Sequence, residues 1–160
     1  IHSLKLEVVR RYRDPAELLA FNGEMRQLFA NLIGNALDAM PKGGRLLLSV
    51  RTSTAWSQPN VRGVRIVVAD TGFGMTEAVR RRIFEPFFTT KDATGTGLGL
   101  WVSSEIIAKH RGTVRVRSRM TDSRAGGDTI FMLFFPFNGL AEQTGKEQEN
   151  QHVAALKGES

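Results

Sequence analysis

The sequence predicts an α+β fold: a two-layer α/β sandwich in which a mixed, mostly antiparallel sheet carries about three helices on one face. Three observations support this prediction. Several short stretches alternate apolar and polar residues with period two, as half-buried strands do. Other segments repeat their apolar residues with helical period. The strands come in a largely antiparallel order with the helices between them, which indicates a sheet covered on one side.

The first half of the chain is expected to form four strands and one helix. Residues 3–12 alternate with period two, and a second strand is expected after the turn around Asp14 and Pro15. The helix has a clear 3.6-residue period and ends at Pro41, which is followed by two glycines. The expected strands cover residues 3–12, 16–21, 45–53 and 64–70, and the expected helix covers residues 24–40.

The second half is expected to form two helices and two strands. A short helix over residues 75–87 opens with Thr76 as its cap and leads into a glycine-bearing loop. A further helix is expected over residues 98–110, and strands over residues 113–120 and 129–136 close the domain.

Length and composition indicate one globular domain over residues 1–137. From residue 138 to 160 the chain is polar, free of aromatic residues and without a sustained apolar period, so a flexible tail or linker is expected there. The sequence has no cysteine, which excludes disulfides and thiolate metal sites and is compatible with a reducing compartment.

No membrane segment is expected in this chain, because its most apolar late run, residues 129–137, is too short to span a bilayer. No signal peptide is visible either, so a cytoplasmic location is expected. The first residue is isoleucine, which is compatible with a piece of a longer protein. The sequence leaves open whether such a parent protein is anchored in a membrane.

The chain has a net charge of +6, and its body is more basic than the whole, because the tail has four glutamates against two lysines. This excess suits anionic ligands such as nucleotide phosphates, nucleic acid or an acidic partner protein. Ordinary solvated surface charge explains it equally well.

The first helix places two asparagines, Asn31 and Asn35, four residues apart in an otherwise apolar segment. Asparagine is a poor helix former, so two of them within a helix cost stability and suggest a functional role. On a helical wheel the polar stripe contains short oxygen-bearing groups and neither lysine nor arginine. Amide oxygens at i and i+4 can converge on one hard cation such as Mg²⁺, although a solvent-facing stripe is the alternative. The stripe comprises Glu24, Gln27, Asn31, Asn35 and Asp38, and the face expected to meet the core comprises Met25, Phe29, Ile33, Ala36, Leu37 and Met40.

Two glycine-containing segments complete the chemical signals. Asp70 ends an apolar strand and is followed by Gly72 and Gly74, so a sharp turn can bring backbone close to a flat ligand. An ionised carboxylate only accepts hydrogen bonds and therefore suits an exocyclic amino donor such as that of adenine. The second segment, "KDATGTGLGL" at 91–100, leads into a helix N-terminus, which favours phosphate; a flexible hinge is the competing explanation.

The order of these motifs resembles that of the catalytic ATP-binding domain of bacterial sensor histidine kinases, within the Bergerat-fold ATPases. An Asn-xxx-Asn helix, then Asp-x-Gly-x-Gly, "IFEPFFTTK" and "GTGLGL" are similar to the N box, first glycine box, F box and second glycine box. The resemblance covers about residues 4–137. It implies the Bergerat fold, Mg·ATP as ligand, and transfer of phosphate to histidine.

The resemblance also implies roles for particular residues. Asn31 and Asn35 would meet the phosphates and Mg²⁺, with Asn35 as direct metal ligand; together with Lys91 they form the expected catalytic set. Asp70 would receive the adenine amino group, supported through water by Thr129. The full set expected at the nucleotide is Asn31, Asn35, Asp38, Asp70, Gly72, Gly74, Met75, Phe84, Phe87, Phe88, Lys91, Gly95, Thr96, Gly97, Leu98, Gly99 and Thr129.

The sequence departs from the family pattern at two places. Many relatives have a basic residue and an aromatic where this chain has Asp38 and Ala39, and "NALDAM" instead resembles the nitrogen-regulation subgroup. A phosphate contact from that basic residue is therefore absent or supplied elsewhere. The common His-Gly-Gly reads His110-Arg111-Gly112, and His110 is expected to face a carbonyl at a helix C-terminus.

Hydrolysing relatives such as gyrase have a glutamate one turn before the metal asparagine, where this chain has Asn31, and this favours phosphate transfer over hydrolysis. None of the three histidines lies in a phosphoacceptor context. The expected partners are therefore a dimerisation and phosphoacceptor domain, upstream or in trans, and a response regulator acting with the full-length kinase.

Two alternatives of other classes remain at this point. The same fold serves serine-directed kinases and ATPase switches. A basic, non-catalytic nucleic-acid-binding module is the other alternative, because Arg115, Arg117 and Arg119 alternate onto one strand face. A solvated edge strand explains the same pattern, so nucleic acid is not the expected partner.

Overall fold

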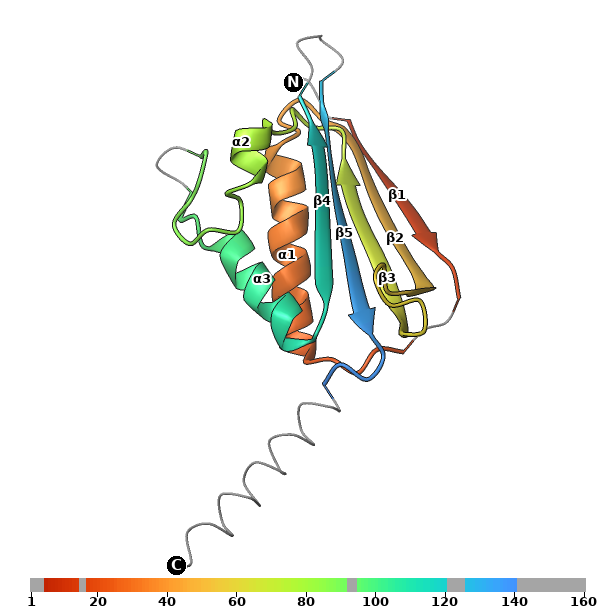
Figure 1. The fold of residues 1–160 in the computed structure, drawn as a ribbon. Helices are drawn as coiled ribbons and strands as arrows, with labels where there is room; N and C mark the ends of the chain where they lie inside the picture. Colours follow the sequence, from red (N-terminus) through yellow and green to blue (C-terminus); the bar gives the residue numbers. More distant parts are fainter. Residues whose placement is uncertain (1–4, 15–16, 92–94, 121–125, 141–160) are drawn as a thin grey trace, which may run out of the picture.

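The computed structural model describes residues 5–14, 17–91, 95–120 and 126–140. One five-stranded sheet forms one layer, and the helices cover one of its faces (Figure 1). The strands are β1 (Leu6–Tyr12), β2 (Gly44–Thr54), β3 (Arg62–Asp70), β4 (Thr113–Arg119) and β5 (Asp128–Pro136), and the helices are α1 (Asn22–Asp38), α2 (Glu77–Arg80) and α3 (Gly99–Lys109).

The sheet is mixed and mostly antiparallel, which confirms the predicted fold class. Its strand order is β1-β2-β3-β5-β4. Only β1 and β2 pair in parallel; β2 with β3, β3 with β5, and β4 with β5 are antiparallel. The register places Asp70 at the end of β3 directly opposite Thr129 on β5. The two residues expected at the adenine end of a site therefore become neighbours although 59 positions separate them in the sequence.

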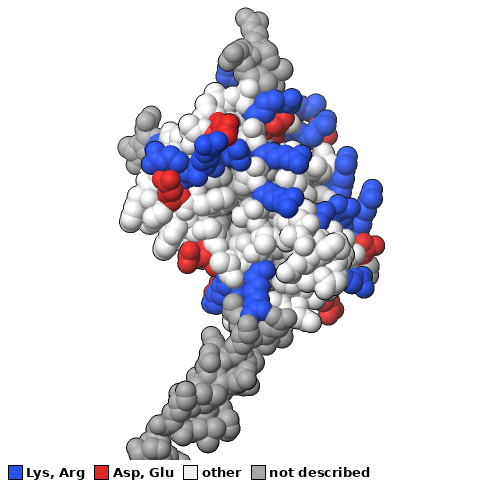
Figure 2. Space-filling view, in the orientation of Figure 1, with Lys and Arg blue, Asp and Glu red and all other residues white. Residues whose placement is uncertain are grey.

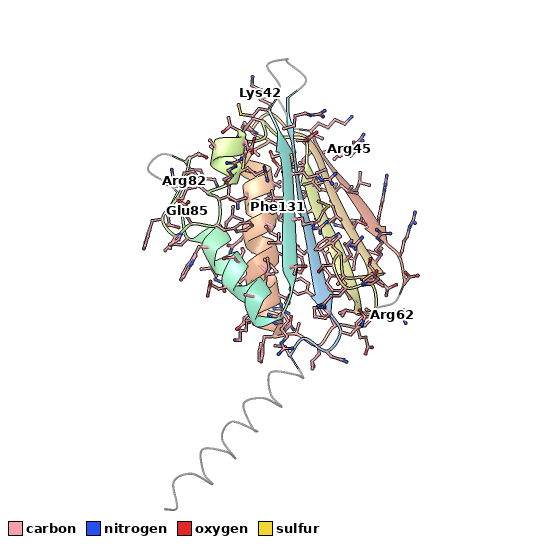
Figure 3. All side chains as sticks on the ribbon, viewed as in Figure 1. Lys42, Arg45, Arg62, Arg82, Glu85 and Phe131 are labelled. Atoms are coloured by element: carbon pink, nitrogen blue, oxygen red, sulfur yellow. The ribbon has the colours of Figure 1, made fainter. Side chains whose placement is uncertain are left out.

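The hydrophobic core lies between the sheet and the helices. Alternate residues of the central strands face it, as the period of two requires. Leu133 and Phe135 of β5 and Val68 of β3 are almost fully buried there, against Leu28 and Leu32 of α1. Figure 3 shows the Phe131 side chain in the same layer, between the sheet and α1.

The structure corrects two sequence predictions at α1. The expected strand over residues 16–21 is wrong: within its described part, residues 17–21 contain no strand and lead directly into α1. Leu18 packs against the core, and the Phe21 ring contacts His110 from the position just before α1, so these apolar side chains belong to a connection. Leu37 was expected in the core but is 42% exposed, because the buried stripe of α1 runs through Leu28 and Leu32 instead.

The expected helix over residues 75–87 is much shorter than predicted. Its cap is confirmed, since the Thr76 hydroxyl accepts a hydrogen bond from the Val79 amide at 3.2 Å. The helix itself spans only Glu77–Arg80, and turns follow it. Pro86 disfavours a continuing helix, and Phe87 adopts a positive φ of 65°. This segment therefore reaches the site as a loop.

His110 confirms the expectation that it faces a carbonyl at the end of α3. Its ring is buried, Nδ1 lies 2.8 Å from the Ile106 carbonyl oxygen, and Nε2 accepts from the Phe21 amide at 3.1 Å. Lys109 pairs with Glu24 on α1. Together these contacts join the end of α3 to the start of α1, so Glu24 belongs to this helix junction and not to a ligand site.

The described residues continue three positions beyond the expected domain end at 137, and Leu140 is buried. The rest of the expected tail, residues 141–160, lies outside the described residues. Among the helices of the described residues, none combines the length and hydropathy needed to cross a bilayer.

Candidate functional site

A cavity of about 600 Å³ lies between α1, the ends of β3 and β5, and the segment from α2 to α3. Thirteen of the seventeen residues expected at the nucleotide line it. They are Asn31, Asn35, Asp38, Asp70, Gly74, Met75, Phe88, Lys91, Gly95, Thr96, Gly97, Gly99 and Thr129. The other four, Gly72, Phe84, Phe87 and Leu98, are not among the lining residues, and their expected ligand contacts stay predictions.

Asp70 is a nearly buried carboxylate at the inner end of the cavity, with 5% of its surface exposed. Its Oδ1 accepts a hydrogen bond from the Gly72 amide at 2.9 Å, which leaves Oδ2 without a hydrogen-bond partner among the described residues. Burial raises the pKa of Asp70 to about 6; the Gly72 bond lowers it and the nearby Asp128 raises it further. Asp70 therefore changes charge close to neutral pH.

A hydroxyl network next to Asp70 connects Thr129 to Ser118. Ser118 Oγ donates to the Asp128 carbonyl at 2.9 Å and accepts from the Met75 amide at 2.8 Å. Thr129 Oγ1 lies 2.9 Å from the same Ser118 oxygen. Either hydroxyl can be the donor in this pair, and in both cases Thr129 Oγ1 keeps a lone pair for the cavity. Sequence reasoning missed Ser118, which carries no motif signal.

The glycines after Asp70 are required by close backbone packing. A Cβ on Gly72 would lie 2.5 Å from the Ala39 carbonyl oxygen, at the end of α1. Gly74 has a φ of +71°, and a Cβ there would lie 2.1 Å from the Arg119 carbonyl oxygen. Gly72 thus shapes the pocket from behind by letting the loop dock on α1, even though it does not line the cavity.

At the other end of the cavity, oxygen atoms of α1 surround a cationic group. Lys91 Nζ lies 3.0 Å from Asn35 Oδ1 and 2.5 Å from Asp38 Oδ2. The amide oxygen and the carboxylate thus already share one positive charge. Their side chains are partly exposed to solvent, so the ion pair is weak and can be exchanged for another cation. This donor set fits a hard cation, which prefers oxygen ligands.

Asn31 has a different role from Asn35. Its Nδ2 donates to the Gly99 carbonyl oxygen at 2.9 Å and to Ser103 Oγ at 3.3 Å. Ser103 Oγ in turn donates to the same Gly99 oxygen at 2.9 Å. The asparagine therefore holds the N-terminus of α3 against α1. Its Oδ1, which would lie 3.7 Å from a Cβ placed on Gly99, is the atom left for a ligand.

The second glycine segment packs against the loop that precedes it. Gly97 has a φ of +68° and a Cβ there would lie 2.4 Å from the Phe87 carbonyl carbon. The Phe87 amide donates to the Gly97 carbonyl at 3.0 Å. Phe87 itself is 75% exposed, so in this structure its backbone, and not its ring, serves the site. The central part of the loop, residues 92–94, lies outside the described residues.

Several lining residues were not predicted from the sequence, because nothing in the sequence distinguishes them from ordinary core or helix residues. Ala30 and Gly34 on α1 leave space beside Asn31 and Asp38, and no atom lies within 4 Å of a Cβ placed on Gly34. Their i, i+4 spacing with Asp38 was the available signal. Further apolar lining comes from seven residues: Ala36, Ala39, Phe73, Val79, Ile83, Leu100 and Phe131.

The arrangement combines an acceptor in an apolar inner end, a cation site near the mouth, and a glycine loop at a helix N-terminus. These features define a nucleotide-binding domain of the ATPase class. Residues 22–139 match the family model "Histidine kinase-, DNA gyrase B-, and HSP90-like ATPase", so the chain belongs to this family. Its similar proteins are sensor histidine kinases.

Sporulation kinase E of Bacillus subtilis (strain 168) is 37% identical over 125 residues, which are 78% of this chain and 15% of that protein. Sensor kinase CckA of Brucella abortus (strain 2308) is 38% identical over 133 residues, which are 78% of this chain and 14% of that protein. The chain thus spans a small fraction of these relatives.

Solved structures agree with the fold and with the kind of domain. The catalytic domain of histidine kinase ThkA, in a nucleotide-free form, has a TM-score of 0.65 and 25% identity, and the match covers 82% of this chain and 80% of that one. Full-length ShkA in complex with AMPPNP has a TM-score of 0.62 and 32% identity, covering 82% of this chain and 26% of that chain. The ATP-binding fold predicted from the sequence is confirmed; the nitrogen-regulation subgroup stays a prediction.

Proposed function

We propose that this domain binds Mg·ATP in the cavity and donates the γ-phosphate to a histidine on a separate dimerisation and phosphoacceptor domain, as one step of two-component signalling. The observation that carries the proposal is the pairing, within one cavity, of a buried carboxylate with a hydrogen-bonding lysine–oxygen cluster. Asp70 lies at the inner end, and Asn35, Asp38 and Lys91 lie together at the other. The named activity of the sensor histidine kinase relatives supports the same assignment.

At the inner end, Asp70 would accept a hydrogen bond from the adenine amino group through Oδ2. The apolar walls, including Met75 and Phe131, would pack against the faces of the base. Thr129 would bond to the base directly or through water with a lone pair that the Ser118 network leaves available. Guanine presents an acceptor where adenine presents its amino group, so the carboxylate would select adenine.

At the phosphate end, Asn35 Oδ1 and Asp38 Oδ2 would hold Mg²⁺, which neutralises phosphate charge when bound. Lys91 would then leave these oxygens and bind a phosphate oxygen. This exchange would supply the cation that relatives place at the position of Asp38. Gly95, Gly97 and the N-terminus of α3 would contribute backbone N–H groups to the phosphates.

Phosphate transfer fits the cavity better than hydrolysis. Its described lining contains two carboxylates, Asp38 and Asp70. Asp38 would be occupied by Mg²⁺, and Asp70 is buried at the opposite end, so neither would activate water at the γ-phosphate. Asn31, at the position of the hydrolytic glutamate, carries an amide that cannot act as a base. A nucleophile supplied by another domain would complete the reaction through positioning and charge neutralisation.

The parent kinase would act with a response regulator, and we place this domain in the cytoplasm, where ATP and such regulators meet. The phosphoacceptor domain would lie upstream in the parent chain or on a partner chain.

Adenosine affinity should fall as the pH falls through about 6, because protonated Asp70 presents a hydrogen where the ligand also donates. Adenosine has no phosphate to titrate. Binding should also release protons near pH 6 but few near pH 8, measured by calorimetry in buffers of different ionisation enthalpy. The stability of the folded domain should depend on pH in the opposite direction. The raised pKa of Asp70 stabilises the folded state at low pH, and this contribution is lost as the pH rises through about 6. Proton uptake on binding would contradict the assignment of Asp70.

The decisive test of the proposed function is incubation of the purified chain with γ-labelled ATP. We expect Mg-dependent binding, very slow release of phosphate and no labelling of the chain itself. Addition of a histidine phosphoacceptor domain from the parent kinase should then produce label on that domain that is lost in acid and stable in base, as phosphohistidine is. Rapid phosphate release would indicate an ATPase, and acid-stable label on serine or threonine would indicate a serine kinase.

A further inference from the structure

The face of the sheet opposite the helices has no described helix over it (Figure 1). In β2, β3, β4 and β5 the residues that pack on the core alternate with residues on this open face. The alternation places arginines of β2, β3 and β4 there, and the parallel pairing of β1 with β2 adds Arg11. These arginines are Arg11, Arg45, Arg51, Arg65, Arg115, Arg117 and Arg119. In Figure 2, Lys and Arg side chains outnumber acidic ones on the right-hand side of the view, away from the helices.

Most of these arginines lack an acidic partner among the residues that the structure describes. Two are paired: Arg45 with Glu7 at 3.0 Å and Arg119 with Asp128 at 2.6 Å. Figure 3 shows Arg45 on the side away from the helices. Arg51 lies directly opposite Arg65 in the register, an arrangement of like charges that destabilises a sheet. Burial lowers the pKa of Arg65 below its ordinary value, and the charges of Arg51 and Arg115 lower it further. The face therefore holds positive charge that the described part of the domain does not offset.

Trp56, in the loop between β2 and β3, holds two of these guanidinium groups in place. The Arg65 and Arg115 guanidinium carbons lie 5.0 and 4.7 Å from the Trp56 ring centroid. Arg65 Nη2 also donates to the Thr54 carbonyl at 2.8 Å, and its buried Nε has no partner. Guanidinium groups ordered in advance lose less entropy when they bind carboxylates. Tryptophan and arginine are also the side chains most enriched at interaction hot spots.

The centre of the same face is apolar. Leu47 of β2, Val67 of β3, and Ile130 and Met132 of β5 are only partly buried there. Arg115 and Arg117 lie on one side, opposite Met132 and Ile130 in the register, and Arg51 lies toward the other side. An apolar centre with a charged rim is the usual composition of a protein interface. Nucleic acid would gain from the arginines but not from the apolar centre.

We propose that this open face, centred on Leu47, Val67, Ile130 and Met132 and rimmed by Arg51, Arg65 and Arg115, docks a partner protein whose surface carries carboxylates around an apolar patch. The charge of the rim sets the chemistry of the partner. The nucleotide cavity lies on the opposite side of the sheet, so a docked partner leaves it open. The proposal does not depend on the phosphotransfer assignment.

The test uses a synthetic nine-residue peptide, Glu-Phe-Glu-Glu-Leu-Glu-Glu-Phe-Glu, as probe, with an all-glutamate peptide of equal length beside it. Calorimetry and amide chemical shifts are measured on the full 160-residue chain and on the double variant Arg51→Glu/Arg115→Glu. The control, Arg10→Glu/Arg26→Glu, changes the net charge equally at two exposed sites outside the face. Circular dichroism and melting temperature confirm folding of both variants.

We expect the mixed peptide to bind more tightly than the all-glutamate peptide and to shift amides of β2, β3, β4 and β5 on this face. The face variant should lose about tenfold or more in affinity, as expected for charge-assisted hydrogen bonds, and the control should change it by less than about twofold. No binding, or equal loss in both variants, would overturn the proposal. Tighter binding of a fifteen-residue oligothymidine with the same variant dependence would assign the face to nucleic acid. Self-association without peptide that the face variant abolishes would assign it to a second copy of the chain.

Discussion

Replacement of Asp70 by asparagine is expected to abolish the preference for ATP over GTP and to remove nearly all nucleotide binding. The amide can present its NH₂ group where adenine also donates, so one hydrogen bond is lost and two donors oppose each other. Loss of a charge-assisted hydrogen bond costs roughly 1.5 to 3 kcal/mol, about ten- to a hundredfold in affinity. Titration of the folded variant with ATP and GTP analogues measures both the loss of affinity and the loss of selectivity.

Asp14→Asn is the matched control for this variant. Asp14 is exposed, lies outside the cavity and binds the Thr52 hydroxyl, and asparagine tolerates its positive φ of 65°. It should leave ATP affinity and selectivity unchanged. An Asp70→Asn variant that still prefers ATP to GTP with unchanged affinity would refute the adenine assignment.

Replacement of Asn35 by alanine should remove most of the Mg²⁺-dependent part of ATP affinity while adenosine affinity changes little. The amide oxygen of Asn35 lies with Asp38 and Lys91 at the phosphate end of the cavity, away from Asp70. Loss of one oxygen ligand weakens the metal site without touching the base pocket. Affinities for adenosine and for an ATP analogue with and without Mg²⁺ separate the two contributions.

Asn35→Asp supplies the control, because a carboxylate keeps an oxygen ligand at the same position and should restore Mg²⁺ dependence in part. Asn31→Ala makes a useful contrast. Its hydrogen bonds to Gly99 and Ser103 join α1 to α3, so its loss should lower the melting temperature as well as nucleotide affinity. Equal losses for adenosine and Mg·ATP in Asn35→Ala would instead point to damaged packing around α1.

The sequence predicted those features that depend on local patterns, namely the strands, the two longer helices and the order of the motifs. The period of two predicted all five observed strands, and the 3.6-residue period predicted α1 and α3 to within about two residues at each end. The order of the asparagine helix and the glycine motifs predicted the ATP-binding family, which the family model confirms. These features depend on neighbouring residues, so a single sequence contains them.

Segments whose structure depends on distant contacts were predicted poorly. Residues 17–21 look like a strand but form a connection, because Leu18 packs on the core and Phe21 meets His110, which is 89 positions away in the sequence. Leu37 has the apolar character of a core residue, yet the direction in which α1 crosses the sheet leaves it exposed.

The sequence by itself determined which chemical groups this protein has: a carboxylate after an apolar strand, two asparagines one helical turn apart, and glycines where backbone must approach backbone. Only the tertiary structure decided which role each of these groups has. It ties Asn31 to α3 and places Asn35 beside Asp38 and Lys91. It also buries Asp70 enough to raise its pKa to about 6. Burial and charge proximity arise from packing between segments far apart in the chain, and no local pattern encodes them.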